Sequence, residues 1–581
     1  MKNNLFLFLA ICMWQFMVLN VSASKPGTTA TWDAGHSTAT DINGNVYVAG
    51  YFNSSTITFG TISLTKTNSV TSSYNMFLVK YGPGGNLLWV TKAGGSGGND
   101  QPNGIVTDGS GNVYVTGLCN TNITFYSFPS SGPTITLNNA NSYLVKYDQY
   151  GNVVWAINEI GLPQWQGIAI AGEYLYCTGS FSGTITIGKT ILTSAGSLDV
   201  FTAEYDLNGN VIWATSAGGS GLDMGIGIAT DINGNAYITG FFDSPSMKFG
   251  TYTLINKGSS SIDDDIYFAK YDVYGNLQWA TSASGSNSVE SWSIASDATG
   301  DTYITGGSGS SSLTFYSAIS SGKTITLNGT SGGPVGYYTV MYDSNGNAIW
   351  AKTGCSSGVG EGVATDQTGN VYATGQYINP TNFGSGTLKS KPVTNPVLDL
   401  FLVKYNSSGS FQWVQYAGGT STLSQDAATD NTGNVLITGY FNASTITFGT
   451  ITLTDGNSGD VDMFIAKYDA NGNALWAKSA GAPPAGTIST PSLAGKNDPT
   501  ANEITVYPNP TSGKVTVSTC NSQSAINSIS VFNMIGKEVL NRQSAVGSQQ
   551  VEIDLSLQPK GLYILEVKAG ENFYQKKIIV E

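Results

Sequence analysis

The stretch "DINGNVYVAGYF" at residues 41–52 is written again, with few changes, as "DGSGNVYVTGLC" at 108–119 and "DINGNAYITGFF" at 231–242. One glycine of this phrase marks each copy, and the spacing from copy to copy stays between 61 and 69 residues. The marker glycines are Gly50, Gly117, Gly179, Gly240, Gly306, Gly375 and Gly439. Such regular spacing indicates a repeated supersecondary unit.

A second phrase follows the first in every copy, for example "FLVKYGPGGNLLWV" from residue 77 and "FIAKYDANGNALWA" from residue 464. It ends on a tryptophan each time, at Trp89, Trp155, Trp213, Trp279, Trp350, Trp413 and Trp476. The two phrases therefore agree on seven copies.

Both phrases contain turns of the form D-x-x-G-N between β-rich runs, which predicts two hairpins, and so four strands, in each copy. In the fourth copy these strands fall near 225–231, 235–242, 267–272 and 276–282. A small four-stranded sheet cannot bury its own faces and needs neighbours to cover them. The sequence therefore predicts an all-β fold, a seven-bladed β-propeller over residues 25–482 followed by a small C-terminal β-sandwich.

Between the second and third strands each copy adds a segment such as "TITFGTISLT" at 56–65, which predicts an accessory hairpin. This segment is longer in copies two and five, from residues 124 and 314, and such variable loops are where a propeller would place specificity. The first copy begins, and the last copy ends, at the same points of the repeated pattern, so no strand is obviously left over to exchange between them. The ring could close by packing of the first copy on the last, or by an extra edge strand from "KPGTTATW" at 25–32.

The pattern "TD..GN.Y.TG.F", followed by "TFG", "KYD..GN..WA" and "GG", resembles the SBBP family, the seven-bladed β-propeller repeat of bacterial secreted proteins, over roughly residues 31–482. The third copy departs from it at "IAGEYLYCTG", which lacks the first turn, and the fifth has Asp301 in place of the asparagine. The resemblance implies a scaffold and not a reaction.

The charge of the chain limits its partners. Only 11% of the residues are charged, the net charge is −13, and the single arginine is Arg542. Nucleic-acid binding draws its affinity from lysine and arginine on phosphates, so the charge disfavours a polyanionic partner and we expect no nucleic-acid partner. A basic membrane-binding face is also disfavoured.

The first 24 residues combine Lys2, an apolar run and a small-residue end, which predicts a secretory signal peptide and no transmembrane segment in the mature chain. Export permits disulfides, but Cys119, Cys177, Cys355 and Cys520 are widely spaced and form no metal motif. We expect isolated buried thiols.

Residues 483–500 are rich in proline and threonine and predict a linker. Residues 501–581 alternate apolar and polar residues, as a β-sandwich does. The words "YPNPTSGKVTVS", "VFNMIGKEV", "LQPKGLYILEV" and "KKIIVE" resemble the type A C-terminal sorting domain of the type IX secretion system of Bacteroidetes. The resemblance implies the secretion machinery as a partner and a final location outside the cell or on its outer surface.

Candidates for catalysis are few. The one histidine, His36, has no histidine or serine partner in the pattern, and we interpret it as a loop residue. Turn aspartates such as Asp41, Asp108, Asp231, Asp366 and Asp430 supply one carboxylate each, fewer than a calcium loop needs, and are assigned to turn formation. The seven tryptophans could offer sugar-stacking faces, but their common position predicts packing between blades.

One set of acids carries a binding hypothesis. Just before the first strand of five copies stand Asp100, Asp223, Glu290, Glu361 and Asp426. Because the first strand of a blade lies nearest the axis, their carboxylates would ring one mouth of the central channel and hold a cation or a cationic ligand. The competing interpretation is that they are solvated loop acids. No cofactor is predicted firmly; Ca²⁺ at these acids is the one left open.

The sequence thus predicts a secreted or cell-surface propeller that binds or presents a glycan or protein ligand and is not an enzyme. The alternative is an extracellular carbohydrate-active enzyme, a lyase or hydrolase, that places acids and tyrosines on the propeller face.

Overall fold

The computed structural model describes residues 31–482, with short internal gaps of which the longest is 389–397, and most of residues 504–580. Every named element in these ranges is a β-strand, so the predicted all-β class is confirmed. The chain divides into two compact units, Met1–Thr487 and Ile488–Glu581. The predicted signal peptide at 1–24 and linker at 483–500 lie outside the described residues.

The fourth copy of the repeat folds as the pattern predicts. Its strands are β17 (Asp223–Thr230), β18 (Ala236–Phe242), β21 (Asp265–Tyr271) and β22 (Leu277–Gly285), and each pairs antiparallel with the next in chain order. The turn between β17 and β18 contains Gly234 at a φ of +80°, a backbone angle that glycine adopts without strain.

The same antiparallel order is found at every other copy of the repeat within the described residues. We number the copies as units 1 to 7 along the chain, with β17, β18, β21 and β22 as unit 4. The other units are β1 (Asp33–Thr40), β2 (Val46–Phe52), β5 (Asn75–Tyr81) and β6 (Leu87–Gly94); β7 (Gln101–Thr107), β8 (Val113–Tyr126), β9 (Thr134–Tyr147) and β10 (Val153–Ile157); β11 (Gln164–Ala171), β12 (Tyr174–Phe181), β15 (Asp199–Asp206) and β16 (Val211–Ala217); β23 (Val289–Ser296), β24 (Thr302–Ser308), β27 (Gly336–Tyr342) and β28 (Ala348–Thr353); β29 (Gly358–Thr365), β30 (Val371–Tyr377), β33 (Asp399–Tyr405) and β34 (Phe411–Ala417); β35 (Thr422–Thr429), β36 (Val435–Phe441), β39 (Asp462–Tyr468) and β40 (Ala474–Ala480).

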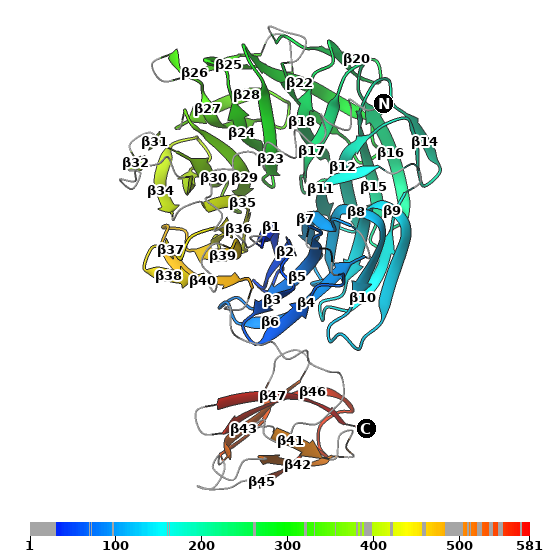
Figure 1. Cartoon of the computed structure of the whole chain (residues 1–581), viewed down its shortest axis with the longest axis vertical. Coiled ribbons are helices and arrows are strands. Elements are labelled where there is room, and N and C mark those ends of the chain that lie inside the picture. The colour runs from blue at the N-terminus through cyan, green and yellow to red at the C-terminus, as the bar shows by residue number, and fades with distance from the viewer. Residues whose placement is uncertain are drawn as a thin grey trace. The chain divides into compact units, whose positions relative to one another are not determined.

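The first strands of the units form the inner wall of a closed ring (Figure 1). Around the ring, β1, β7, β11, β17, β23, β29 and β35 contact one another in that order, and β35 contacts β1. This arrangement is a β-propeller.

The ring closes with the same bond that joins consecutive units inside it. The Asp33 amide donates to the Val461 carbonyl at 2.9 Å, as the Asp223 amide of unit 4 donates to Leu198 of unit 3 at 2.9 Å. Trp32 forms a parallel bridge to Val461, as Leu222 does to Leu198. Among the described residues, closure therefore needs no exchanged strand: residues 25–30 of the candidate edge strand at 25–32 lie outside them, and Trp32 forms the same kind of bridge to Val461 as Leu222 forms to Leu198.

Neighbouring units bury each other's faces. The second and third strands of unit 4 are almost wholly buried. At the closure, Val46 and Val48 of unit 1 pack in one hydrophobic cluster with Leu436 and Ile465 of unit 7. The free energy gained by removing these apolar surfaces from water is available only when adjacent units are in place.

Accessory hairpins stand between the second and third strands, as predicted. They also bind the preceding unit: the Thr58 amide donates to Gly481 of unit 7 at 3.1 Å, and the Lys248 amide to Gly218 of unit 3 at 2.9 Å. In unit 2 the hairpin is continuous with β8 and β9. The separate hairpin strands are β3 (Thr56–Phe59), β4 (Ile62–Thr65), β13 (Thr184–Ile187), β14 (Thr190–Thr193), β19 (Ser246–Phe249), β20 (Tyr252–Ile255), β25 (Ser312–Phe315), β26 (Ile325–Asn328), β31 (Thr381–Phe383), β32 (Gly386–Leu388), β37 (Thr445–Phe448) and β38 (Ile451–Thr454).

The C-terminal unit has two antiparallel sheets, β41-β42-β45 and β44-β43-β46-β47. Val515 and Val517 on β42 share one buried cluster with Ile529 and Val531 on β43, so the two sheets pack on a common core, as a sandwich does. Its strands are β41 (Ile504–Tyr507), β42 (Lys514–Thr519), β43 (Ile526–Asn533), β44 (Glu538–Gln543), β45 (Gln550–Asp554), β46 (Gly561–Ala569) and β47 (Asn572–Val580).

Candidate functional site on units 6, 7 and 1

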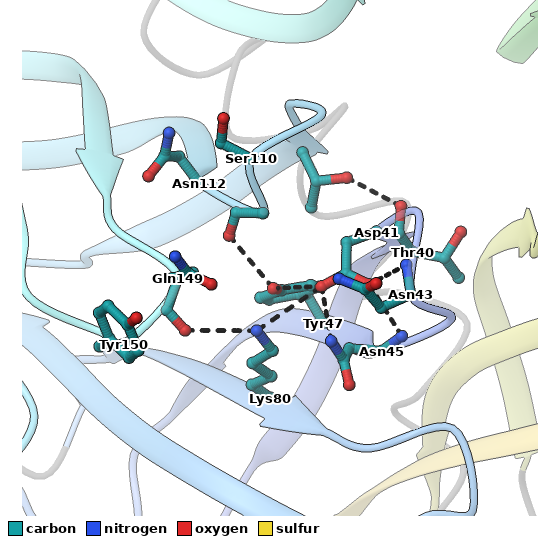
Figure 2. Close-up of polar contacts among 12 residues, drawn as sticks. Thr40, Asp41, Asn43, Asn45, Tyr47, Lys80, Ser110, Asn112, Gln149 and Tyr150 are labelled. Atoms are coloured by element: carbon teal, nitrogen blue, oxygen red, sulfur yellow. Dashed lines mark hydrogen bonds and ion pairs between the residues drawn. The ribbon is translucent and has the colours of Figure 1, made fainter. Parts of the chain in front are cut away.

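The turn aspartates hold their own hairpins, as Asp41 shows in Figure 2. Asp41 Oδ1 accepts the amides of Asn43 and Asn45 at 2.9 and 3.0 Å, and Oδ2 accepts the Asn45 side chain at 2.7 Å and the Tyr47 hydroxyl at 2.9 Å. Lys80 lies 3.6 Å from the same Oδ2. The carboxylate is thus saturated by its own unit, and the same pattern recurs at Asp430.

The repeated tryptophan and lysine join each unit to the next. Trp89 Nε1 donates to the Gln149 carbonyl of unit 2 at 3.1 Å, and Lys80 Nζ donates to the same oxygen at 3.3 Å. At the closure, Trp476 Nε1 donates to Pro83 of unit 1 at 2.9 Å. The equivalent acceptors for Trp155, Trp213, Trp279, Trp350 and Trp413 are Leu207, Val273, Ser344, Ser407 and Ala470. The tryptophans therefore join neighbouring units, as their common position predicts.

The five predicted acids do not stand at one level of the ring. Asp100 immediately precedes β7 and Asp223 is the first residue of β17, but Glu290 is the second residue of β23, Glu361 the fourth of β29 and Asp426 the fifth of β35. Placing all of them just before the first strand was therefore wrong for the last three. The reason is that the inner strands begin earlier in the sequence than the periodic pattern indicates.

Three of these acids serve the scaffold. Burial raises the pKa of Asp100 and of Asp223 to about 7, and both carboxylates accept bonds from nearby loops. Asp426 accepts the Ser37 hydroxyl at 2.8 Å and the Thr38 amide at 2.9 Å, so it ties unit 7 to unit 1. None of the three is a solvated loop acid.

Glu361 and Glu290 remain as candidates for binding. Burial, helped by the charge of Glu290, raises the pKa of Glu361 to about 8. Burial, helped by Asp264, raises that of Glu290 to about 7. The Gln376 side chain donates from Nε2 to Glu361 Oε1 at 3.2 Å, while Gln376 Oε1 is buried with no hydrogen-bond partner among the described residues.

Glu361 occupies a β-bulge that every inner strand contains. The register of β29 against β30 shifts between Gly360 and Gly362, which leaves Glu361 unpaired. A bulge re-aims one side chain and is often found beside functional sites. The equivalent residues are His36, Asn103, Gln166, Ile226, Trp292 and Gln425, and all seven bulge residues are half-buried. His36 is therefore a strand residue and not a loop residue; its burial lowers its pKa to about 4.

A second position distinguishes units 6, 7 and 1 from the rest. The residue after the marker glycine is Gln376, Tyr440 and Tyr51 in these three consecutive units. In units 2 to 5 it is Leu118, Ser180, Phe241 and Gly307. The sequence prediction missed this triplet because it considered only what the copies share. A comparison of the residue that follows each marker glycine would have found it.

The triplet belongs to a compact group that we call the tyrosine cluster, formed by Trp32, Tyr51, Tyr74, Glu361, Gln376 and Tyr440. The ring centroids of Tyr51 and Tyr74 lie 5.1 Å apart with planes at 84°, and those of Trp32 and Tyr440 lie 5.6 Å apart with planes at 63°. Burial, together with the nearby Tyr51, Glu361 and Tyr74, raises the pKa of Tyr440 well above its usual value. Among the described residues, the phenol oxygens of Tyr51, Tyr74 and Tyr440 make no hydrogen bond.

In the described part of the chain, no group of three or more His, Cys, Asp or Glu side chains gathers to hold a metal ion. No helix there is long and apolar enough to cross a membrane. The described thiols, Cys119 and Cys177, are buried and unbridged, as expected.

Comparison with known families agrees with the repeat and the tail. Residues 88–123 match the β-propeller repeat called SBBP, and residues 505–581 match the secretion system C-terminal sorting domain. The chain therefore combines an SBBP-type β-propeller with a type IX sorting tail. It is exported, and its destination is the exterior or the outer surface of the cell.

Among curated proteins, the chain is 26% identical over 480 residues to an uncharacterised WD repeat-containing protein of Acanthamoeba polyphaga mimivirus, covering 67% of this chain and 34% of that one. It is 25% identical over 256 residues to the regulatory protein FlaEY of Caulobacter vibrioides, covering 42% and 25%. The chain thus spans only about a third and a quarter of these relatives' lengths.

Two solved structures overlap weakly with the chain. A protein of Bacteroides caccae shares 10% identity at a TM-score of 0.28, covering 58% of this chain and 89% of its own. The Pan2 WD40 domain of Neurospora crassa shares 7% at a TM-score of 0.25, covering 60% and 86%. Overlaps this low inform neither fold nor function.

Proposed function

We propose that the exported propeller is a binding or presenting module without enzymatic activity of its own, and that the tyrosine cluster is where it engages its ligand. The repeated polar residues are saturated by contacts within and between units, as Asp41 and Trp89 illustrate. The tyrosine cluster combines aromatic rings, a carboxyl and phenols that make no hydrogen bond among the described residues, and it lies where units 6, 7 and 1 differ from the other units. This asymmetry is the observation that carries the proposal.

The proposal is tested by probing glycan and protein arrays with the secreted chain and with a Tyr51→Leu, Glu361→Gln double variant. Both substitutions install residues that other units already carry at the same positions, Leu118 and Gln166, so the fold should tolerate them. We expect the wild-type chain to retain a ligand that the double variant loses. Equal retention by both would place binding elsewhere, and retention of nothing would refute the binding role.

The alternative function, a carbohydrate-active lyase or hydrolase, is favoured by one specific observation. A carboxyl whose pKa is about 8 lies within electrostatic reach of a phenol, in the pair Glu361 and Tyr440. Such groups can exchange protons with a substrate near neutral pH. Product release from a panel of polysaccharides and glycosides, abolished in Glu361→Gln, would establish the enzyme and overturn the binding module.

A further inference from the structure

We propose that the tyrosine cluster binds an alkylated ammonium group, as carried by choline or a methylated amine. The inference rests on the proposed binding function and specifies the chemistry of its ligand. It draws on the geometry of the aromatic rings, on the charge around them and on the differences between units of the propeller.

The aromatic rings of the tyrosine cluster belong to two edge-to-face pairs. Tyr51 and Tyr74 stand almost perpendicular, and Trp32 and Tyr440 form the second pair. Tyr51 and Tyr74 both lie close enough to Tyr440 to act on its pKa, so the two pairs are neighbours. A cation over the face of tryptophan or tyrosine is attracted by the ring quadrupole, and alkylated ammonium ions, which are weakly hydrated, are the ligands that aromatic cages recognise.

The polar groups of the cluster favour positive charge as well. Glu361 supplies a carboxyl, and the unpartnered Oε1 of Gln376 supplies a carbonyl dipole beside it. Glu290 lies on the neighbouring inner strand, close enough for its charge to act on Glu361. Burial keeps the nearby His36 neutral at pH 7, because it lowers its pKa to about 4. A cation entering here would meet acceptors and aromatic faces and no fixed imidazolium.

The other charged groups around the cluster are Asp426 on β35, Asp264 beside Glu290, and Asp33 with Lys66 near Tyr74. Asp426 is occupied by Ser37 and Thr38. Lys66 Nζ donates to the Val70 and Ser73 carbonyls, so its ammonium has backbone acceptors of its own. Burial raises the pKa of Asp426 and of Asp264 only to about 6, so both carboxyls are largely ionised at pH 7 and their negative charge favours a cation.

Titration calorimetry of the secreted chain with choline, against the neutral isostere 3,3-dimethyl-1-butanol, isolates the contribution of charge. We expect choline to bind and the isostere to bind at least about tenfold more weakly, since one good cation–π contact is worth about that factor. Tyr51→Phe keeps the ring and should keep the affinity. Tyr51→Leu removes the ring and should weaken choline about tenfold. Tyr274→Ser, at an exposed turn of unit 4, is the matched control and should change nothing.

Choline binding should also be linked to protons. A bound cation favours the charged form of Glu361, so affinity should rise from pH 6 to pH 9 and binding at pH 7 should release protons. Glu290 and Asp33 titrate in part of this range. Glu361→Gln should therefore weaken binding and make the pH dependence shallower. Thermal unfolding of each variant checks that the fold is intact.

Equal binding of choline and its isostere, no binding of either, or wild-type affinity in both Tyr51→Leu and Glu361→Gln would each overturn the inference. A chain that ignores choline yet retains an array ligand through the tyrosine cluster would overturn it and leave the binding function standing. If choline binds, phosphatidylcholine vesicles and a trimethyl-lysine peptide distinguish a lipid headgroup from a protein side chain as its source, and binding of neither identifies a free small molecule.

Discussion

Replacing Trp476 by alanine tests how the ring is closed. The indole of Trp476 lies on Gly85, where an added Cβ would come within 2.8 Å of the ring, and its Nε1 donates to Pro83, a residue 393 positions earlier. Its exposed fraction is 9%. Truncating a buried tryptophan typically costs about 3–5 kcal/mol, of which the lost hydrogen bond contributes about 1 kcal/mol.

The matched substitution is Trp89→Ala, at the junction of units 1 and 2. Trp89 is 4% exposed, and its Nε1 donates to the Gln149 carbonyl at 3.1 Å. Lys80 donates to the same carbonyl, as Lys467 donates to the Pro83 carbonyl at the closure. Because closure uses the bonds of an internal junction, we expect the two variants to lose the same unfolding free energy to within about 1 kcal/mol. A ring that is open in solution at this junction would give almost no loss for Trp476→Ala.

Urea unfolding followed by tryptophan fluorescence measures both losses. All eleven tryptophans lie at or before Trp476, so the signal reports on the propeller and is silent about the C-terminal unit. Each variant retains the other repeat tryptophans as probes. A loss for Trp476→Ala below a third of that for Trp89→Ala would refute closure by equivalent contacts.

Three further predictions follow from buried charge and from the tail. Burial raises the pKa of Asp33, Asp100 and Asp223 to about 7, so the stabilisation from their protonation is complete below about pH 4 and is lost as the pH rises through 7. The melting temperature should therefore be higher at pH 5 than at pH 8. A melting temperature that does not change with pH would contradict this. Asp430→Asn strands the buried Lys467 ammonium, 2.8 Å away in the wild type, and should cost about 3–5 kcal/mol in urea unfolding; a loss below 1 kcal/mol would show that the ion pair does not matter. A chain without residues 505–581 should accumulate in the periplasm, as fractionation and mass spectrometry would show, and its normal appearance outside the cell would exclude the tail as the export signal.

The sequence predicts the scaffold because the scaffold is local chemistry repeated. The D-x-x-G-N turn is held by contacts within its own unit, the tryptophan bonds to the next unit, and both are found where the pattern places them. The C-terminal domain could be predicted for a similar reason, because its characteristic segments lie in consecutive strands.

The candidate site could not be predicted in the same way, because its residues come from different units. Tyr51 and Tyr440 are 389 positions apart in the chain and adjacent only because the ring closes. Strand starts were also misjudged at Glu290, Glu361 and Asp426, because β23, β29 and β35 begin before these residues.

Because the units share one backbone, each unit can be compared with the others, and the comparison shows which positions can carry a function. A residue that recurs in every unit, such as the repeat tryptophan, must satisfy the same contact everywhere, so its recurrence is explained by packing. A function confined to one sector needs positions that differ between units while their backbone stays the same. The bulge and the residue after the marker glycine meet both conditions, and only across units 6, 7 and 1 do they bring a carboxyl, an amide and two tyrosines together. A substitution that copies one unit's residue into another therefore changes the site with little effect on the scaffold, and this separates a binding defect from a folding defect.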